Sequence, residues 1–344
     1  ARENHTHPAD HARAETRRIL GAMRGWLVEY RARAELVACE ESKARDEPKD
    51  EPMIFYPGKN NNALNTRPFA PESITGCAMV NPHYRVDLAP GTRYIIDSGA
   101  FQERDMLARL QPWQALDRQL RLEAQIEYGG HGGPAEAIVT YDMLVGVDEA
   151  LVDGKRKKVR GTEESAAPAV AETLRSARYY ATQVPRVRGA IAYAAQGATV
   201  AQYLACVDAL LPLMRPGVDW LAFGGFCIIG RVPSLKPLFY AVLDAALPRC
   251  RAAGITRAHL LGVTVADAIT VAAGAERRYG VALSTDSTGP EQCAVFGRGY
   301  TADGRQTELG LRKQDKFITY HPRDLAHDNI RTYTRWIETL GDAA

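Results

Sequence analysis

Short apolar runs that end in turn residues alternate with amphipathic stretches along most of this chain. Continuous apolar runs are typical of strands buried on both faces, and apolar residues spaced three and four apart are typical of helices packed against them. This pattern predicts eight strands, at residues 53–58, 77–82, 94–97, 137–142, 189–197, 218–225, 259–263 and 281–286. It predicts helices at residues 112–128, 163–182, 200–214, 234–253 and 265–279.

The alternation predicts an α/β fold in which helices cover a parallel sheet. Eight is the number of strands that closes a (β/α)8 barrel, so we predict a TIM-like barrel, although no long helix separates the first two strands. An open doubly wound sheet is the alternative, but no dinucleotide or P-loop glycine motif supports it. The predicted domains are an N-terminal helical extension with a linker at 1–50, the barrel at 51–300, and a C-terminal basic segment with a helix at 301–344.

Composition adds limits to this picture. The 344 residues are 46% hydrophobic and 24% charged, which is typical of a globular protein, and the net charge of +2 does not by itself indicate a nucleic-acid partner. No apolar run approaches the roughly 18 residues of a membrane span, and the chain does not start with a signal-peptide pattern, so we expect a cytoplasmic protein without a membrane partner. The six cysteines form no C-x-x-C pair, so we expect buried, reduced thiols and no metal site.

The residues that end the predicted strands carry the candidate chemistry, because the active site of such a barrel lies at the carboxyl ends of its strands. They are Asp97, Asp142, Gln196, Gly197, Gly224, Gly225, Gly262 and Asp286. Two carboxylates across a pocket can catalyse displacement at the anomeric carbon of a sugar, one as the nucleophile and one as the acid/base. A carboxylate with amide and backbone N–H donors can bind a planar heterocycle such as guanine. A glycosidase or an aldolase stays open at this point, although no lysine ends a strand as an aldolase requires.

Several of these segments resemble the tRNA-guanine transglycosylase superfamily. Residues 97–102, D-S-G-A-F-Q, are similar to its D-S-G-G-F-Q signature, with Ala100 at the second glycine. Gln196-Gly197 resembles its Q-G pair, residues 224–226 its G-G-L segment, and residues 260–263 its L-M-G-V strand. Within the superfamily, residues 284–287 and the compact helix–strand spacing look most similar to the DpdA branch, whose members insert 7-deazaguanines into DNA.

The resemblance implies a role for each matching residue. Asp286 would be the nucleophile that forms a covalent glycosyl-enzyme intermediate, and Asp97 the general acid/base. Asp142 would bind the N–H edge of the base, with Gln196 and the Gly225 N–H at its carbonyl oxygen. Further substrate contacts are expected at Ser98, Phe101, Gly197, Gly224 and Gly262. The implied reaction exchanges guanine for a free 7-deazaguanine base, such as 7-cyano-7-deazaguanine, and needs no cofactor.

Two features bear on which nucleic acid is the substrate. The tRNA enzymes carry a C-x-C-x-x-C zinc site with a later histidine beyond the nucleophile, but here only Cys293 follows Asp286, so we expect no zinc subdomain and favour DNA. A basic run follows the Asp142 strand and is either a solvated loop or a clamp for the DNA backbone. Its members are Lys155, Arg156, Lys157, Lys158 and Arg160.

We therefore predict a DNA-guanine transglycosylase whose partners are DNA and a free 7-deazaguanine base. The alternatives are a tRNA-guanine transglycosylase that lacks zinc, a hydrolytic glycosylase, and a non-catalytic barrel subunit that binds nucleic acid. The presence of both Asp97 and Asp286 argues against the non-catalytic alternative. Protein partners and the oligomeric state stay open.

Overall fold

The computed structural model describes nearly all of the region in which the sequence predicts strands. The described residues are 53–59, 71–103, 109–130, 133–309 and 322–342, except 85, 87, 146, 153, 154 and 233. For residues 147–152 and 155–160 the description covers the backbone only. The predicted N-terminal helical extension lies outside the described residues.

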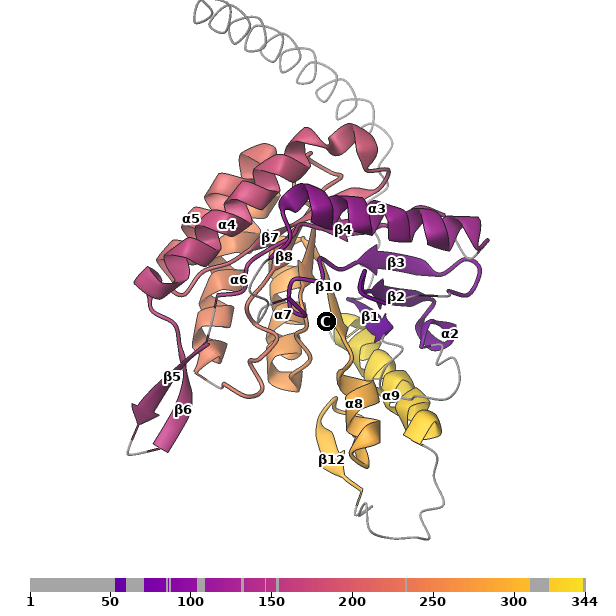
Figure 1. Ribbon diagram of the computed structural model, residues 1–344. Coiled ribbons are helices and arrows are strands. Elements are labelled where there is room, and N and C mark those ends of the chain that lie inside the picture. The colour runs from indigo at the N-terminus through magenta and orange to yellow at the C-terminus, as the bar shows by residue number, and fades with distance from the viewer. Residues whose placement is uncertain are drawn as a thin grey trace, which may run out of the picture. The chain divides into compact units, whose positions relative to one another are not determined.

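Eight parallel strands close into a barrel (Figure 1). They are β1 (Ile54–Lys59), β2 (Cys77–Val80), β3 (Arg93–Ile96), β4 (Ala137–Val139), β7 (Ala190–Ala195), β8 (Trp220–Phe223), β9 (Arg257–Leu260) and β10 (Ala282–Ser287). Each strand pairs with the next in this order, and β10 closes the barrel by pairing with β1. The structure confirms the predicted TIM-like barrel and rules out the open doubly wound sheet.

The strands are apolar on both faces because one face fills the barrel and the other lies under the helices. In β7 the residues at 190, 192 and 194 pack in the cluster that fills the barrel, whereas those at 191, 193 and 195 pack in the surrounding core. Every residue of the inner set in β7 is alanine. These small side chains leave room for Tyr56 and Trp220, which are both buried in the same inner cluster.

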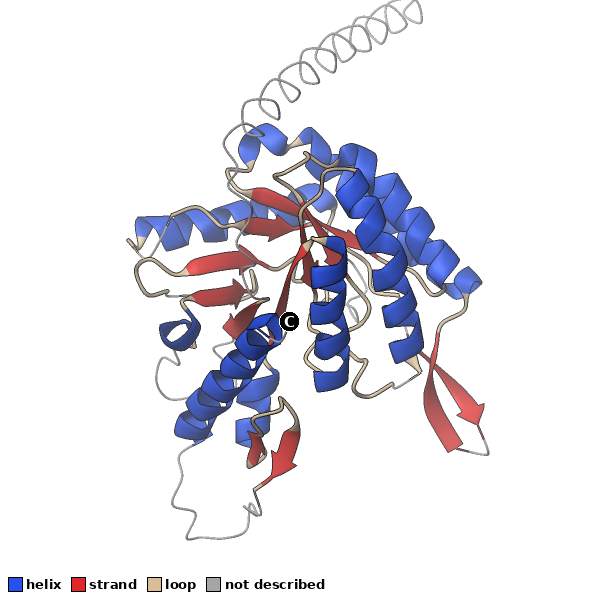
Figure 2. Ribbon diagram, turned by 180° about the vertical axis from the view of Figure 1, so that it is seen from behind, coloured by secondary structure: helices blue, strands red, loops and turns tan. Residues whose placement is uncertain are grey.

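Five long helices follow strands β3, β4, β7, β8 and β9 and surround the barrel (Figure 2). They are α3 (Pro112–Tyr128), α4 (Glu163–Thr182), α5 (Val200–Leu210), α6 (Leu235–Ala252) and α7 (Ala266–Tyr279). All five were predicted, and their boundaries agree with the predictions to within four residues at each end. Helix α5 ends early because the chain tightens into a 3-10 turn at Leu211–Leu213, which contains Pro212. No helix in the described part of the chain is long and apolar enough to cross a membrane.

The C-terminal helix α9 (Pro322–Asp342) covers the part of the barrel where a long helix is missing. Only the four-residue helix α2 (Glu72–Thr75) lies between β1 and β2, and α9 packs against both α2 and β1. Tyr333 of α9 is buried against the rings of Phe55 and Trp336, with ring centroids 4.9 and 5.3 Å away. Its hydroxyl donates to the Thr264 carbonyl at 3.1 Å. The chain thus uses a distant segment to seal the start of its barrel.

The segment between β10 and α9 extends the end of the barrel at which the strands finish. It consists of α8 (Gly289–Val295) and a small antiparallel pair, β11 (Arg298–Tyr300) and β12 (Gln306–Glu308). Helix α8 packs closely on α9. In Figure 1 this segment lies on the same side of the barrel as a second hairpin, which leaves the end of β4.

That second hairpin corrects one part of the sequence prediction. The basic run at 155–160, which was interpreted either as a solvated loop or as a clamp, forms strand β6 (Lys155–Arg160), paired antiparallel with β5 (Val147–Val152). The register places Glu149 opposite Lys158. An Asp-Gly pair stands between the two strands in the sequence, and such a pair between six-residue runs is a strong signal for a two-residue hairpin turn. The sequence analysis overlooked this signal.

Removing the Tyr333 ring should strongly destabilise the barrel. We expect Tyr333→Ala to lower the free energy of unfolding by about 3–5 kcal/mol, because a buried aromatic ring between α9 and β1 is removed. Tyr333→Phe keeps the ring and removes one hydrogen bond, so it should cost only about 1 kcal/mol. Urea denaturation followed by circular dichroism measures both. Equal effects of the two variants would show that the α9 ring cluster does not stabilise the barrel.

Candidate active site

A cleft of about 730 Å³ opens where the barrel strands end. All three aspartates predicted for the site line it, and they come from the ends of three different strands, β3, β4 and β10. Other predicted site residues also line the cleft: Ser98, Phe101, Gly224, Gly225 and Gly262. The structure therefore brings most of the predicted set to one place.

Asp97, directly after β3, has its carboxyl group held on both sides. Its Oδ2 accepts a hydrogen bond from Asn81 Nδ2 at 2.8 Å, and its Oδ1 accepts from the Ser98 N–H at 2.8 Å. Burial, followed by the charges of Asp286 and Asp142, raises the pKa of Asp97 to about 7, although hydrogen bonds from the Ser98 and Gly99 amides oppose the shift. A carboxyl group with this pKa can both donate and accept a proton near neutral pH.

The turn after Asp97 is anchored by polar contacts to the buried carboxylate of Glu103. Gly99 has a φ of +76°, and a Cβ there would lie 2.9 Å from the ring of His83, so the turn requires glycine. His83 Nε2 and Arg118 Nη2 both contact Glu103 Oε1, at 3.0 and 2.7 Å. Tyr141 also donates a hydrogen bond to the Glu103 carboxylate. These contacts hold both ends of residues 97–103, and with them the acid at 97.

Asp142 is a buried carboxylate at the back of the cleft. Its Oδ1 accepts from Ser98 Oγ at 3.2 Å, and its Oδ2 accepts from Gln196 Nε2 at 2.6 Å. Arg109 Nη2 donates to its backbone carbonyl at 2.5 Å. Burial raises the pKa of Asp142, while the hydrogen bonds from Gln196 and Ser98 work in the opposite direction. This arrangement presents a fixed acceptor to the N–H edge of a ligand.

Gln196 and Gly197 do not line the cleft. Gln196 is fully buried behind Asp142, so in this structure it orients Asp142 and does not face a ligand. A Cβ at Gly224 would lie 2.2 Å from Gln196 Nε2, and one at Gly225 would lie 2.9 Å from Gln196 Oε1, so both glycines are needed for the Gln196 amide to fit. A Cβ at Gly197 would lie 2.6 Å from the backbone of Tyr203, so Gly197 is required for packing on α5.

Asp286 lies within β10, with one oxygen held and the other available. Its Oδ1 accepts from the Gly262 N–H at 2.8 Å and lies 3.1 Å from His259 Nε2. His259 is fully buried, and its Nδ1 lies 2.8 Å from Ser284 Oγ. Asp286 Oδ2 has no hydrogen-bond partner among the described residues, and the side chain lines the cleft.

The sequence analysis missed two residues that hold the catalytic candidates. Asn81 is the polar residue at the carboxyl end of the second predicted strand, just before Pro82, so the same strand-end criterion that selected Asp97 also applied to it. His259 lies inside β9, and its contact with Asp286 depends on the register of β9 with β10, which pairs His259 with Ser284. No sequence pattern signals that contact.

Two further expectations have mixed outcomes. Four cysteines (Cys77, Cys206, Cys250 and Cys293) are buried and free, as predicted, but Cys227 is exposed and lines the cleft, which corrects the prediction for that residue. Cys39 lies outside the described residues. The predicted nucleic-acid contacts on β6 also lie outside them, because the description of that strand stops at its backbone.

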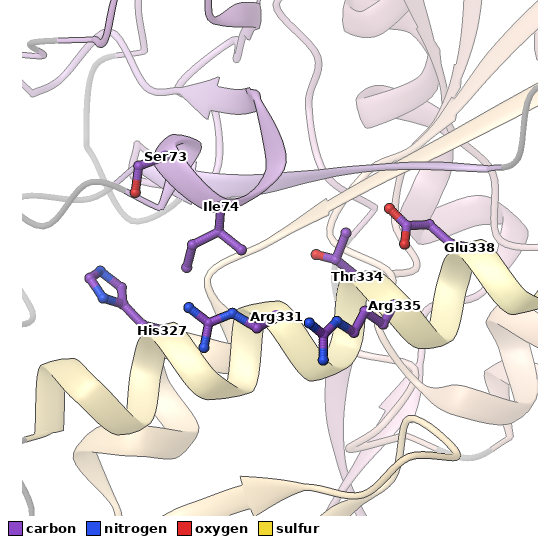
Figure 3. Close-up of a pocket in the computed structure, with 7 residues that line it drawn as sticks. All are labelled: Ser73, Ile74, His327, Arg331, Thr334, Arg335 and Glu338. Carbon is purple, nitrogen blue, oxygen red and sulfur yellow. The ribbon is translucent and has the colours of Figure 1, made fainter.

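A second cavity, of about 410 Å³, lies between α2 and α9 (Figure 3). Its lining residues are Ser73, Ile74, His327, Arg331, Thr334, Arg335 and Glu338. It shares no residue with the cleft and contains none of the three site aspartates. Arg335 is exposed there, with no ion pair among the described residues, and serves below as a control position.

No family model matches this chain, and no curated protein matches it either. The functional interpretation therefore depends on the residues themselves and on their geometry.

The raised pKa of Asp97 should make stability fall as the pH rises. Because folding raises this pKa from 3.8 to about 7, the folded chain holds the Asp97 proton more tightly between these values. The resulting stabilisation is complete below pH 3.8 and disappears as the pH approaches 7. Asp97→Asn imitates the protonated acid, so its melting temperature relative to the parent should rise from about pH 4 to about pH 7 and then level off.

Thermal denaturation at a series of pH values measures this difference. Asp324→Asn, at an exposed position on α9, is the matched control and should show no such trend. Altered hydrogen bonding to Asn81 adds an offset that does not depend on pH. A difference that stays constant from pH 4 to 8 would contradict the raised pKa.

Proposed function

We propose that this protein is a base-exchange transglycosylase that replaces guanine in DNA with a 7-deazaguanine. The observation that carries the proposal is the contrast between two aspartates in one cleft. Asp286 has one oxygen held by the Gly262 N–H and in contact with His259, and its other oxygen has no partner among the described residues, which suits a nucleophile. The pKa of Asp97 is instead raised to about 7, which suits an acid/base. The likeness of residues 97–102 to the transglycosylase signature supports the same roles.

The proposed reaction has two displacements. Asp286 Oδ2 attacks C1′ of the guanine nucleotide, the bond from C1′ to the base breaks, and Asp97 gives its proton to the departing guanine. The ester between C1′ and Asp286 then holds the sugar. Asp97, now ionised, takes the ring N–H proton of the incoming 7-deazaguanine, whose nitrogen attacks C1′ and releases Asp286. One glycosidic bond replaces another, so the strand stays intact and no energy source is consumed.

Base recognition is assigned to Asp142 and the backbone of the β8 turn. The Asp142 carboxylate accepts from the N–H edge of guanine, which the incoming deazaguanine shares. The Gly225 N–H lines the same cleft, has no hydrogen-bond partner among the described residues, and can donate to the carbonyl oxygen of the base. Gln196 contributes indirectly, because its amide donates a hydrogen bond to Asp142 and so orients the carboxylate that binds the base. Phe101, which is 43% exposed at the cleft, can stack on the base.

DNA is favoured over tRNA by the sequence beyond the nucleophile. Only one cysteine follows Asp286, so the zinc-site pattern of the tRNA enzymes is not present in the sequence. A guanine in duplex DNA must leave the base stack to reach the cleft, which costs a few kcal/mol. Contacts with the phosphate backbone must supply part of that energy. The basic strand β6 belongs to the hairpin that follows the end of β4, on the side of the barrel where the cleft opens.

Base exchange can be tested directly with labelled polymers. The purified protein is incubated with DNA or tRNA carrying labelled guanine, with and without 7-cyano-7-deazaguanine, and the products are analysed by mass spectrometry. We expect label release and incorporation of the deazaguanine with DNA only. Incorporation into tRNA would favour the zinc-free tRNA enzyme, abasic product without added base would favour a hydrolytic glycosylase, and no reaction with either polymer would contradict the proposal.

Variants of the two aspartates should separate their roles. Asp286→Ala should abolish both exchange and the covalent protein–DNA species, which is visible on a denaturing gel. Asp97→Asn should reduce exchange by about 100- to 10,000-fold, the range for removal of a general acid/base. Asp303→Asn, at an exposed turn, is the control and should retain full activity. Normal exchange by Asp97→Asn would remove Asp97 from the mechanism.

The basic strand β6 should contribute to DNA binding by neutralising phosphates. Changing Lys155, Arg156, Lys157 and Lys158 to Ala should weaken binding and flatten its dependence on salt, by a slope of about 0.9 for each phosphate that the variant no longer neutralises. Fluorescence anisotropy of a labelled duplex from 50 to 200 mM salt measures the slope. An unchanged slope would assign β6 no role in DNA binding.

A further inference from the structure

The rim of the cleft differs in chemistry from its interior. Three aspartates line the interior, so a phosphodiester backbone is repelled from it, and only the extruded nucleotide can enter. The rest of the strand must cross the rim. Two arginines line the cleft, Arg231 and Arg298, and one exposed aromatic residue, Phe296, lies on the side of α8.

Phe296 is held firmly and yet exposed. It follows the last residue of α8, its side chain is 64% exposed, and its N–H donates to the Cys293 carbonyl at 3.1 Å. Helix α8 is itself fixed, because Ala294 is fully buried and Asn329 of α9 donates to the Pro290 carbonyl at 3.1 Å. A single exposed apolar residue is common on protein surfaces. Phe296 is distinguished by its position, since it and Phe101 are the large exposed apolar residues of the described chain that line the cleft.

Arg231 is the cation of the rim whose charge is not neutralised. Arg298 forms an ion pair with Glu308 at 2.7 Å, whereas Arg231 has no ion pair or side-chain hydrogen bond among the described residues. It lies on the turn between β8 and α6, where its own N–H donates to the Ile228 carbonyl at 2.8 Å. Its neighbours in the chain, Ile229 and Val232, are buried. The turn that places the Arg231 guanidinium at the cleft is therefore fixed by a backbone hydrogen bond and by buried neighbours.

We propose that Phe296 and Arg231 form a strand-holding rim, in which Phe296 stacks on a base next to the extruded guanine and Arg231 binds a flanking phosphate. The inference rests on the proposed function for the identity of its ligand, a DNA strand. Stacking on an aromatic ring tolerates any base, and a guanidinium binds phosphate through paired N–H donors. The rim would hold the strand without reading its sequence, while the interior selects the base.

Two variants test the two contacts separately, by anisotropy of a labelled single-stranded oligonucleotide across a salt series. Phe296→Ala should weaken binding by about 5- to 150-fold, the range for removal of one stacking partner, and should leave the salt slope unchanged. Phe296→Trp should retain tight binding because it can still stack. Arg231→Ala should weaken binding and lower the salt slope by about 0.7, and Arg231→Lys should restore that slope.

Matched controls come from outside the cleft. Tyr128→Ala removes a 96% exposed aromatic ring from the last residue of α3, and Arg335→Ala removes an exposed arginine from the second cavity (Figure 3). Both should bind DNA as the parent does. Parent-like binding by Phe296→Ala and Arg231→Ala, or weakening equal to that of the controls, would overturn the proposed rim.

The outcome is distinguishable from failure of the proposed function, because binding needs no chemistry. If the parent exchanges bases and both rim variants bind DNA as the parent does, the proposed transglycosylase activity is supported and the proposed role of the rim is contradicted. If DNA binding depends on Phe296 and Arg231 but no base exchange occurs, the proposed role of the rim is supported and the proposed transglycosylase activity is contradicted. An absence of DNA binding by the parent would overturn the rim.

Discussion

The pairing of β10 with β1 is the contact on which the rest of the structure depends. It joins segments at opposite ends of the barrel sequence and sets Asp286 opposite Tyr56 in the register. Because all eight strands are parallel, closure brings every carboxyl end to the same end of the barrel, and residues as far apart in the sequence as Gly58 and Gln306 come to line one cleft. No long helix lies between β1 and β2, and the aromatic residues of α9 pack over β1 in its place, which covers this strand pairing.

Within the cleft, chemically identical side chains acquire different properties from their surroundings. Asp142 is buried and Asp97 is partly buried, and desolvation raises both pKa values. Asp97 also faces the charges of its two neighbours, while Asp142 receives hydrogen bonds from Gln196 and Ser98 that stabilise its ionised form. Asp286 is held by a backbone amide and the edge of His259. The three aspartates of one cleft therefore differ in their neighbours and in their hydrogen-bond donors, which is the contrast on which the proposed roles depend.

The glycines of the site connect this chemistry to the packing around it. Gly224 and Gly225 leave space for the Gln196 amide, and Gly262 turns with a φ of +68° so that its N–H reaches Asp286. Without these glycines, the Gln196 amide could not reach Asp142 and the backbone N–H of residue 262 could not reach Asp286.

The sequence by itself determined the strands, the long helices and the identity of the aspartates, because burial patterns and strand-end positions are local properties of the chain. The β5–β6 hairpin was also readable from the Asp-Gly pair that stands between its two strands in the sequence, although that signal was overlooked. Only the tertiary structure decided that Gln196 lies behind Asp142, that Asn81 and His259 hold the two catalytic candidates, and that α9 seals the barrel. These contacts depend on register and closure, which join residues far apart in the chain, and no local pattern of polar and apolar positions encodes such a distance.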